Sequence, residues 1–159
     1  MRPRLRKLAL TAHIASSVGW FGAVLTFLAM AVVGLTTQDD RVVRAANVIA
    51  EPMVWYVVLP FAVASLLTGL VSSLGSAWGL LRHYWVIFKL VLNVFATAVL
   101  LIYTRTVDQF AAVAADPASD LAPLRSPTFV LHAGGALVVL VVALVLAVYK
   151  PRGVTGLRI

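Results

Sequence analysis

The chain contains no cysteine, and this excludes disulfide bonds, thiolate metal sites and thiol catalysis. Acidic residues are scarce as well, because only 6 of the 159 residues are Asp or Glu. The sequence has no Ser-His-Asp arrangement, no paired carboxylates within an apolar run, no glycine-rich phosphate loop and no zinc-ligand spacing. These absences favour a protein that binds or assists over an enzyme.

Charge of either sign is sparse, since 12% of the residues are charged and 62% are hydrophobic. Soluble domains are about a quarter charged and about half apolar. The apolar residues gather in four runs, at about 8–35, 51–74, 84–103 and 126–149. A helix of about 20 apolar residues crosses a bilayer. The sequence therefore predicts an all-α fold, a four-transmembrane-helix bundle of up-down-up-down topology that uses residues 1–159 as a single membrane domain.

The first run resembles a secretory signal peptide, because basic residues precede it. Its uncharged stretch, however, extends from Leu8 to Gln38. The apolar region of a signal peptide is much shorter, at about 7–15 residues. We therefore expect the first run to be retained as a span.

The distribution of charges predicts how the spans are oriented. The acidic residues lie in or beside the first and third connections: Asp39, Asp40, Glu51, Asp108, Asp116 and Asp120. Many basic residues lie instead at the two chain ends and in the second connection: Arg2, Arg4, Arg6, Lys7, Arg82, Lys150, Arg152 and Arg158. An excess of Lys and Arg marks the cytoplasmic face, so both termini are predicted to be cytoplasmic. This orientation, with anionic lipid headgroups as partners, accounts for the net charge of +7 without nucleic acid.

Two segments are predicted to lie outside the membrane on the outer side. Residues 41–50 are expected to form a short helix on the outer surface. Residues 104–125 are expected to form an irregular outer loop, because Pro117 and Pro123 interrupt them. Within the second span, Pro60 is expected to kink the helix, since it has no N–H to bond to the preceding turn.

Ionisable and strongly polar side chains inside a span are costly, and they mark candidate functional sites. His13 in the first span and Lys89 in the third both lie toward the cytoplasmic side, and Asn93 lies one turn after Lys89. Ser17 and Trp20 follow His13 at helical spacing. Two polar stripes at one depth face each other more cheaply than they face lipid. We therefore expect an inner-leaflet pocket lined by His13, Ser17, Trp20, Lys89 and Asn93.

Each of these ionisable residues also fits a simpler structural role. Lys89 can extend its ammonium group to the cytoplasmic headgroups, and His13 can be a neutral residue that packs between helices. His13 and His83 share the cytoplasmic side and are the candidate metal or haem ligands, although His83 also fits a residue of the membrane interface. His13 and His132 are about 20 Å apart along the membrane normal, so they cannot ligate one haem together.

On the outer side, Glu51 begins the second span and His132 lies one turn into the fourth. A carboxylate is favoured near a helix N-terminus. We therefore expect Glu51 and His132 to form an outer polar pair.

The segment from Leu70 to Leu90, LVSSLGSAWGLLRHYWVIFKL, resembles that of a widespread family of small, functionally uncharacterised bacterial integral membrane proteins. His13 with Gly19-Trp20 and the ending VYKPRG at 148–153 share this resemblance. It implies a four-helix protein of the bacterial plasma membrane without assigning an activity. More distantly, the histidine followed by Gly-Trp is similar to the copper-resistance D-type membrane domain, which implies copper or haem handling.

Three functions follow from these observations. The first is a membrane protein that binds a ligand in the inner pocket or acts as an accessory subunit, with membrane lipids, another protein or a second copy as partners. The second is a haem- or copper-binding redox protein, which requires a bound chromophore. The third is a subunit of a small-solute transporter, which requires a polar path from the inner pocket to Glu51 and His132.

Overall fold

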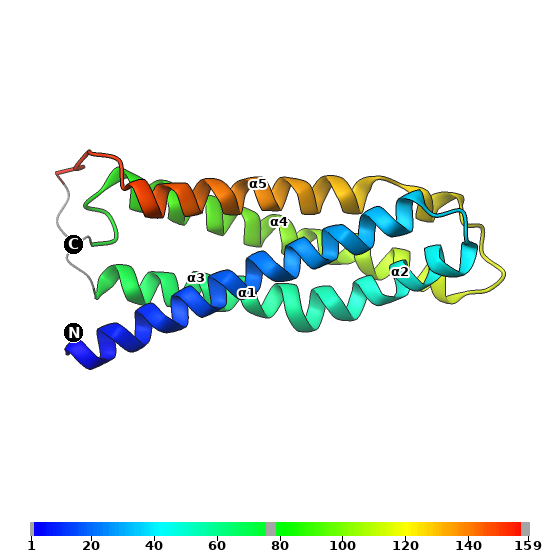
Figure 1. Cartoon of the computed structure of the whole chain (residues 1–159), viewed down its shortest axis with the longest axis horizontal. Helices are drawn as coiled ribbons and strands as arrows, with labels where there is room; N and C mark the ends of the chain where they lie inside the picture. The colour runs from blue at the N-terminus through cyan, green and yellow to red at the C-terminus, as the bar shows by residue number, and fades with distance from the viewer. Residues whose placement is uncertain (1, 76–78, 157–159) are drawn as a thin grey trace.

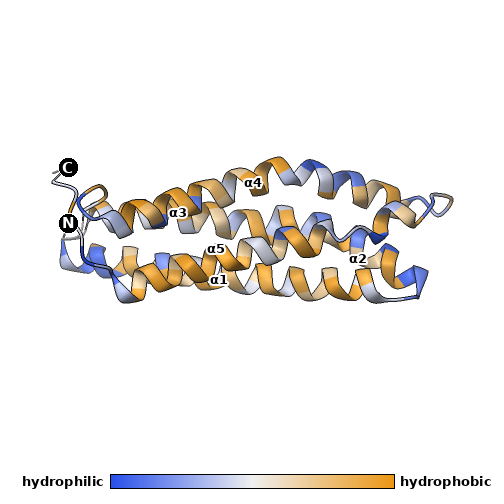
Figure 2. Cartoon of the chain, turned by 90° about the horizontal axis from the view of Figure 1, so that it is seen from above, coloured by the Kyte–Doolittle hydropathy of each residue, from blue (hydrophilic) through white to orange (hydrophobic). Residues whose placement is uncertain are grey.

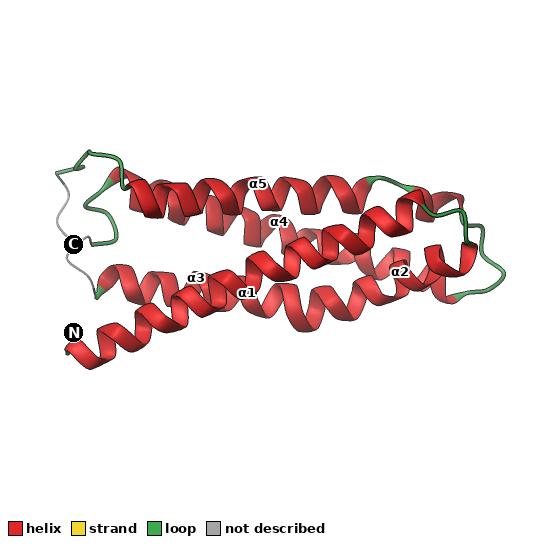
Figure 3. Cartoon of the chain, viewed as in Figure 1, coloured by secondary structure: helices red, strands yellow, loops and turns green. Residues whose placement is uncertain are grey.

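The computed structural model describes residues 2–75 and 79–156, which fold into a bundle of long helices (Figure 3). Residues 76–78 of the Leu70–Leu90 segment, together with Met1 and 157–159, lie outside the described residues. The elements in chain order are α1 (Pro3–Thr36), α2 (Asp40–Met53), the π-helical η1 (Val54–Val58), α3 (Leu59–Leu74), α4 (Tyr84–Ala115), the 3-10 helix η2 (Ala122–Arg125) and α5 (Thr128–Tyr149).

Four helical stretches are long and apolar enough to cross a membrane: Pro3–Thr36, Asp40–Leu74, Tyr84–Ala115 and Ala122–Tyr149. This confirms the prediction of an all-helical chain with four apolar helices. Hydrophobic residues dominate the middle of the bundle, and hydrophilic residues gather toward its two ends (Figure 2). The core joins Trp20, Val24 and Phe27 of α1 to residues of η1, α3, α4 and α5.

Residues 41–50 are helical as predicted, but they do not form a short helix apart from the second span. These residues belong to α2, which continues through η1 into α3 as one helical stretch from Asp40 to Leu74. The face of α2 that carries Val43, Asn47 and Ala50 is buried. This amphipathic face packs on α1 and α4, so α2 lengthens the bundle instead of lying apart from it.

The irregular loop predicted at 104–125 is also wrong over its first half. Helix α4 continues to Ala115, and its added turns bury Val107, Ala111 and Ala114. These apolar residues recur at helical spacing, a signal that the charges at Arg105 and Asp108 obscured. The extension of α4 supplies the surface against which α2 packs, so each of the two elements needs the other.

A π-helical turn precedes Pro60, where the sequence predicted a kink. The N–H of Leu59 donates to the carbonyl of Val54, five residues earlier. Pro60 lacks the N–H that would continue the α-helical pattern, and Pro52 imposes the same gap two residues before η1. The backbone accommodates the two prolines by widening one turn without breaking the helix.

The two ends of the bundle differ. At the terminal end, formed by the start of α1, residues 79–84 and 150–156, helix α1 begins and α5 ends (Figure 1). There the N–H of Thr155 donates to the carbonyl of Arg82 at 3.0 Å, which ties the segment after α5 to the start of α4. At the loop end, formed by residues 37–44 and 116–127, the connections from α1 to α2 and from α4 to α5 meet.

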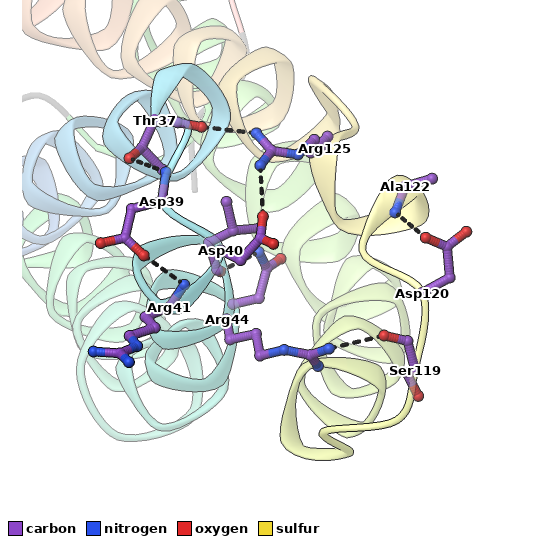
Figure 4. Close-up of polar contacts among 11 residues, drawn as sticks. Thr37, Asp39, Asp40, Arg41, Arg44, Ser119, Asp120, Ala122 and Arg125 are labelled. Atoms are coloured by element: carbon purple, nitrogen blue, oxygen red, sulfur yellow. Dashed lines mark hydrogen bonds and ion pairs between the residues drawn. The ribbon is translucent and has the colours of Figure 1, made fainter.

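Two arginines close the loop end. The guanidinium of Arg125 donates to the Thr37 carbonyl at 2.7 Å and forms an ion pair with Asp40 at 3.1 Å (Figure 4). The guanidinium of Arg44 donates to four carbonyl oxygens after or at the end of α4, those of Ala114, Asp116, Pro117 and Ser119. Arg44 thus caps the C-terminus of α4, where helix carbonyls have no partner within the helix.

The carboxyl group of Asp116 stabilises the same turn. It accepts from the backbone N–H of Ala118 at 3.0 Å and from the Ser119 hydroxyl at 2.8 Å. These two hydrogen bonds, with a smaller contribution from the Arg44 charge, lower the pKa of Asp116. Arg44 therefore stabilises the turn after α4 by donating to its carbonyl groups. Asp116 stabilises the same turn by accepting from its N–H and hydroxyl donors.

The contact between α1 and α2 gives a stability prediction. A Cβ added at Gly34 would lie 2.8 Å from the Ala46 Cβ, an atom fixed to its own backbone, whereas a Cβ at Gly22 meets nothing within 4 Å. Gly34→Ala should therefore destabilise the protein by about 1–3 kcal/mol. Gly22→Ala on the same helix should be neutral or stabilising by up to about 1 kcal/mol. Thermal unfolding in detergent micelles measures both, and equal effects would contradict the close approach.

Candidate functional site

A cavity of about 380 Å³ lies among α1, η1, α4 and α5. Its wall is almost wholly apolar and includes Val24 and Phe27 of α1, Val54 and Val58 of η1, and Phe95 of α4. Pockets that bind small molecules are commonly about 300–1,000 Å³ and mostly apolar, with a few polar groups that orient the ligand. The volume and the lining therefore suit an apolar small molecule.

The π-helical turn shapes this cavity. Val54 and Val58 are the buried residues of η1, and both belong to its wall. Single π-helical turns are rare, and they occur frequently at functional sites. Pro52 and Pro60 thus affect the shape of the cavity through the π-helical backbone that lies between them.

The cavity extends to the exterior of the bundle, on the side formed by α4 and α5. Phe95 of α4 and Leu131 of α5 line it, yet their side chains are 61% and 67% exposed. Surface of this kind on an apolar helix stretch is the surface that would face lipid. The wall of the cavity therefore includes apolar surface of α4 and α5 that is exposed on the bundle.

One cluster supplies nearly all the polarity of this wall. The rings of Tyr103 and His132 are stacked, with centroids 3.7 Å apart. The Tyr103 hydroxyl and the Thr128 hydroxyl lie 2.8 Å apart and share a hydrogen bond. The Nδ1 atom of His132 lies 2.9 Å from the Thr128 carbonyl oxygen. Tyr103 and His132 line the cavity, and Thr128 fixes both of them from the first turn of α5.

A second, much smaller cavity, of about 20 Å³, lies among α1, α3 and α4. His13, Lys89 and Asn93, three of the residues expected to form an inner pocket, line it. A volume of about 10–15 Å³ is needed for one water molecule, so this cavity has room for little more than one. The chain brings these three residues together, but the space between them does not fit a haem or a quinone ring.

The other two expected pocket residues serve helix packing. The Ser17 hydroxyl lies 2.8 Å from that of Ser65, and Trp20 is only 2% exposed within the core. The expectation that they line the inner pocket is wrong, because neither belongs to its wall. Polar groups that pair across two helices hold them together where lipid provides no hydrophobic drive.

His13 takes part in the same contact between α1 and α3. Its Nδ1 atom lies 3.1 Å from the Ser65 carbonyl oxygen and 3.3 Å from the Thr68 hydroxyl. The edge of its ring also packs on Gly69, where an added Cβ would lie 3.0 Å from the ring. His13 is therefore a hydrogen-bonded packing residue that also borders the small cavity.

Lys89 is the cation of the small cavity, and it is partly buried. Within residues 2–75 and 79–156 its ammonium group has neither an acidic partner nor a hydrogen bond. The Asn93 side chain donates to the Lys89 carbonyl at 2.7 Å, so its amide nitrogen is occupied by the backbone. The ammonium group of Lys89 therefore places a positive charge at this site that no acidic side chain of the described residues pairs with.

The predicted outer pair between Glu51 and His132 is wrong. His132 bonds to Thr128 and stacks on Tyr103, and Glu51 is exposed with no ion pair in the described part of the chain. The reason is geometric, because the bond to the carbonyl one turn earlier holds the imidazole against its own helix. The sequence did not single out Tyr103 and Thr128 as partners, since contacts across 25 residues leave no local pattern.

The candidate metal ligands do not converge. His13 borders the small cavity, whereas His83 precedes α4 and pairs through its backbone with Val154. Among the described residues, no group of three or more His, Cys, Asp or Glu side chains could hold a metal ion. Protein metal sites of the common kinds need three or four such ligands, so these residues do not fit one.

No protein-family model, curated protein or solved structure matches this chain. The family resemblance read from its sequence stays a prediction.

The unneutralised charge of Lys89 gives the next prediction. Removing an unpaired cation from a partly buried site relieves its desolvation, so Lys89→Met should leave the free energy of unfolding unchanged or raise it by about 1 kcal/mol. Lys7→Met, at an exposed position of the terminal end, is the matched control. Denaturant unfolding in micelles measures both. A loss of more than about 1 kcal/mol for Lys89→Met alone would mean that Lys89 holds a stabilising partner.

Proposed function

We propose that this chain is a four-span protein of the bacterial plasma membrane that binds a lipophilic small molecule in the cavity among α1, η1, α4 and α5. The observation that carries the proposal is an apolar space of about 380 Å³ with its polar groups concentrated at Tyr103 and His132. Such a site matches a molecule that is mostly hydrocarbon and carries one polar group. It differs from the site that the sequence favoured, which has room for little more than a water molecule.

We further propose that both termini are cytoplasmic and that the helices cross the membrane in alternating directions. The support comes from charge, since eight of the thirteen Lys and Arg residues belong to the chain ends and the second connection. Four arginines lie instead in segments that this orientation places on the outer side: Arg41, Arg44, Arg105 and Arg125. Arg44 and Arg125 are bound to carbonyl groups and to Asp40, so half of these opposing charges already have partners within the chain.

The two other functions receive less support. A haem needs a ligand at the iron and cations for its propionates. The large cavity offers His132 but no Lys or Arg in its wall, so the residues present do not fit that group. A transport path needs continuous polar groups, yet the buried Trp20 and Ala62 stand between the two cavities along α1 and α3. The binding function needs neither feature.

The orientation can be tested by labelling, because the chain has no cysteine of its own. Single cysteines at Arg82 and at Asp116, each in a connection between helices, should differ in intact cells. We expect an impermeant thiol reagent to label Asp116→Cys and to spare Arg82→Cys until the cells are opened. The reverse pattern would overturn the proposed orientation.

Two neighbouring glycines test the cavity. A side chain at either Gly134 or Gly135 meets nothing within 4 Å, but only Gly135 lines the cavity. Gly135→Leu should therefore fill part of the space and weaken binding of the probe 4-nonylphenol at least about tenfold, while Gly134→Leu should bind it as the wild type does. Binding is measured as the saturable rise in thermal stability at a fixed detergent concentration.

The matched glycines separate a specific site from general partitioning. Both substitutions add the same side chain to the same helix, so a change in helix propensity cancels between them. Equal loss of the stabilisation in both variants, or no saturable stabilisation of the wild type, would overturn the proposed site.

A further inference from the structure

The hydrogen-bonding state of His132 defines the head group of the ligand. We infer that the large cavity selects lipophilic molecules whose polar group donates a hydrogen bond, such as a phenol or a long-chain alcohol, with the Nε2 atom of His132 as the acceptor. This inference rests on the proposed function of the cavity and specifies its ligand.

The tautomer follows from the partner of Nδ1. That atom lies 2.9 Å from the Thr128 carbonyl oxygen, and a carbonyl oxygen can only accept. Nδ1 must therefore carry the hydrogen. In a neutral imidazole the other nitrogen, Nε2, is then a lone-pair acceptor without a hydrogen.

The bond to Thr128 and one further contact fix the orientation of the ring. The Thr128 carbonyl belongs to the residue four positions earlier on α5, so the bond between them spans one helical turn. The Tyr103 ring stacks on the imidazole with 15° between the planes, which fixes the plane of the imidazole. A ring held by one nitrogen and by its face has its second nitrogen directed away from its own backbone.

The Nε2 atom has no partner within the described chain. Within residues 2–75 and 79–156 the polar contacts of His132 are made by Nδ1, and its ring face is covered by Tyr103. His132 lines the cavity and is exposed, so a molecule that occupies the cavity can approach its unpartnered nitrogen. A ligand hydroxyl that donates to Nε2 satisfies the last polar atom of the imidazole.

The chemistry therefore separates two kinds of ligand that have the same hydrocarbon part. A hydroxyl group donates to Nε2. An ether or ketone oxygen has no hydrogen to donate, and it would place its own lone pair against the lone pair of Nε2. Sites built to bond a polar group discriminate against the analogue that lacks it, because the site is then left unpaired. The cavity should therefore bind the donor more tightly than the acceptor with the same hydrocarbon part.

A matched pair of probes tests this inference. The probe 4-nonylphenol has a hydroxyl group, and 4-nonylanisole has a methoxy group at the same position. We expect the wild-type protein to bind the phenol about tenfold more tightly than the ether, the difference that one hydrogen bond in an apolar site provides. Saturable stabilisation against heat, at a fixed detergent concentration, gives both dissociation constants.

Two variants assign the preference to one atom. In His132→Phe the ring that stacks on Tyr103 remains but its nitrogens are gone, so the two probes should bind within about twofold of each other. In Tyr103→Phe the stacked ring also remains and only the hydroxyl is lost, so the preference for the phenol should persist. A preference that survives His132→Phe and disappears in Tyr103→Phe would move the acceptor from His132 to Tyr103 and overturn the inference.

The outcomes distinguish this inference from the proposed function. If the wild-type protein binds the ether as tightly as the phenol, and Gly135→Leu weakens both, the cavity binds lipophiles but the donor inference fails. If neither probe stabilises the wild-type protein saturably, the proposed function fails as well. The comparison between probes uses the wild-type protein alone, so a variant that does not fold leaves the test intact.

Discussion

The bundle depends on one constraint, which is that polar groups inside a membrane must bond to protein because no water reaches them. Its side chains obey this rule in a simple way. Thr68 and Thr97 each donate to the carbonyl four residues earlier, so their hydroxyl hydrogens are bonded within their own helix. The amide nitrogen of Asn47 does the same, although its Oδ1 atom is buried without a hydrogen-bond partner among the described residues. Where two helices cross, polar side chains also pair between helices, as the Ser17 hydroxyl does with that of Ser65. The interior is therefore apolar in effect although it contains polar residues.

Among residues 2–75 and 79–156, each of the two cavities is lined by a residue with a polar group that has no protein partner, whereas the Asn47 Oδ1 and Ser72 Oγ atoms are buried without a partner away from both cavities. The ammonium group of Lys89 has no partner within the described part of the chain, and it borders the small cavity. The Nε2 atom of His132 has no partner among the described residues either, and His132 lines the large cavity. An unpartnered polar group beside a cavity indicates which polar group of a bound molecule it could contact. The small cavity has room for a water molecule, whereas the large one has room for a ligand.

The shape of the large cavity comes from backbone chemistry at some distance from its polar end. The prolines at 52 and 60 leave carbonyls without their usual donors, and the helix between them widens into a π-helical turn. That turn places Val54 and Val58 in the cavity wall. Beyond it, α2 and the end of α4 pack together, and Arg44 holds the carbonyls that follow α4. The loop end thus fixes helices whose middle parts leave room for a ligand.

Composition and the lengths of the apolar runs determined the helical class and the four stretches, because crossing a membrane requires about 20 apolar residues in succession. The depth of His13 and Lys89 along their helices followed from a fixed rise per residue, and this placed them at one level. Tertiary structure alone decided the rest. Local pattern carries no information on which helix faces another, so it could not reveal that Tyr103 stacks on His132 or that α2 packs on an extended α4. The volume enclosed between helices depends on side chains from four elements at once, and for that reason the larger cavity became visible only in the folded chain.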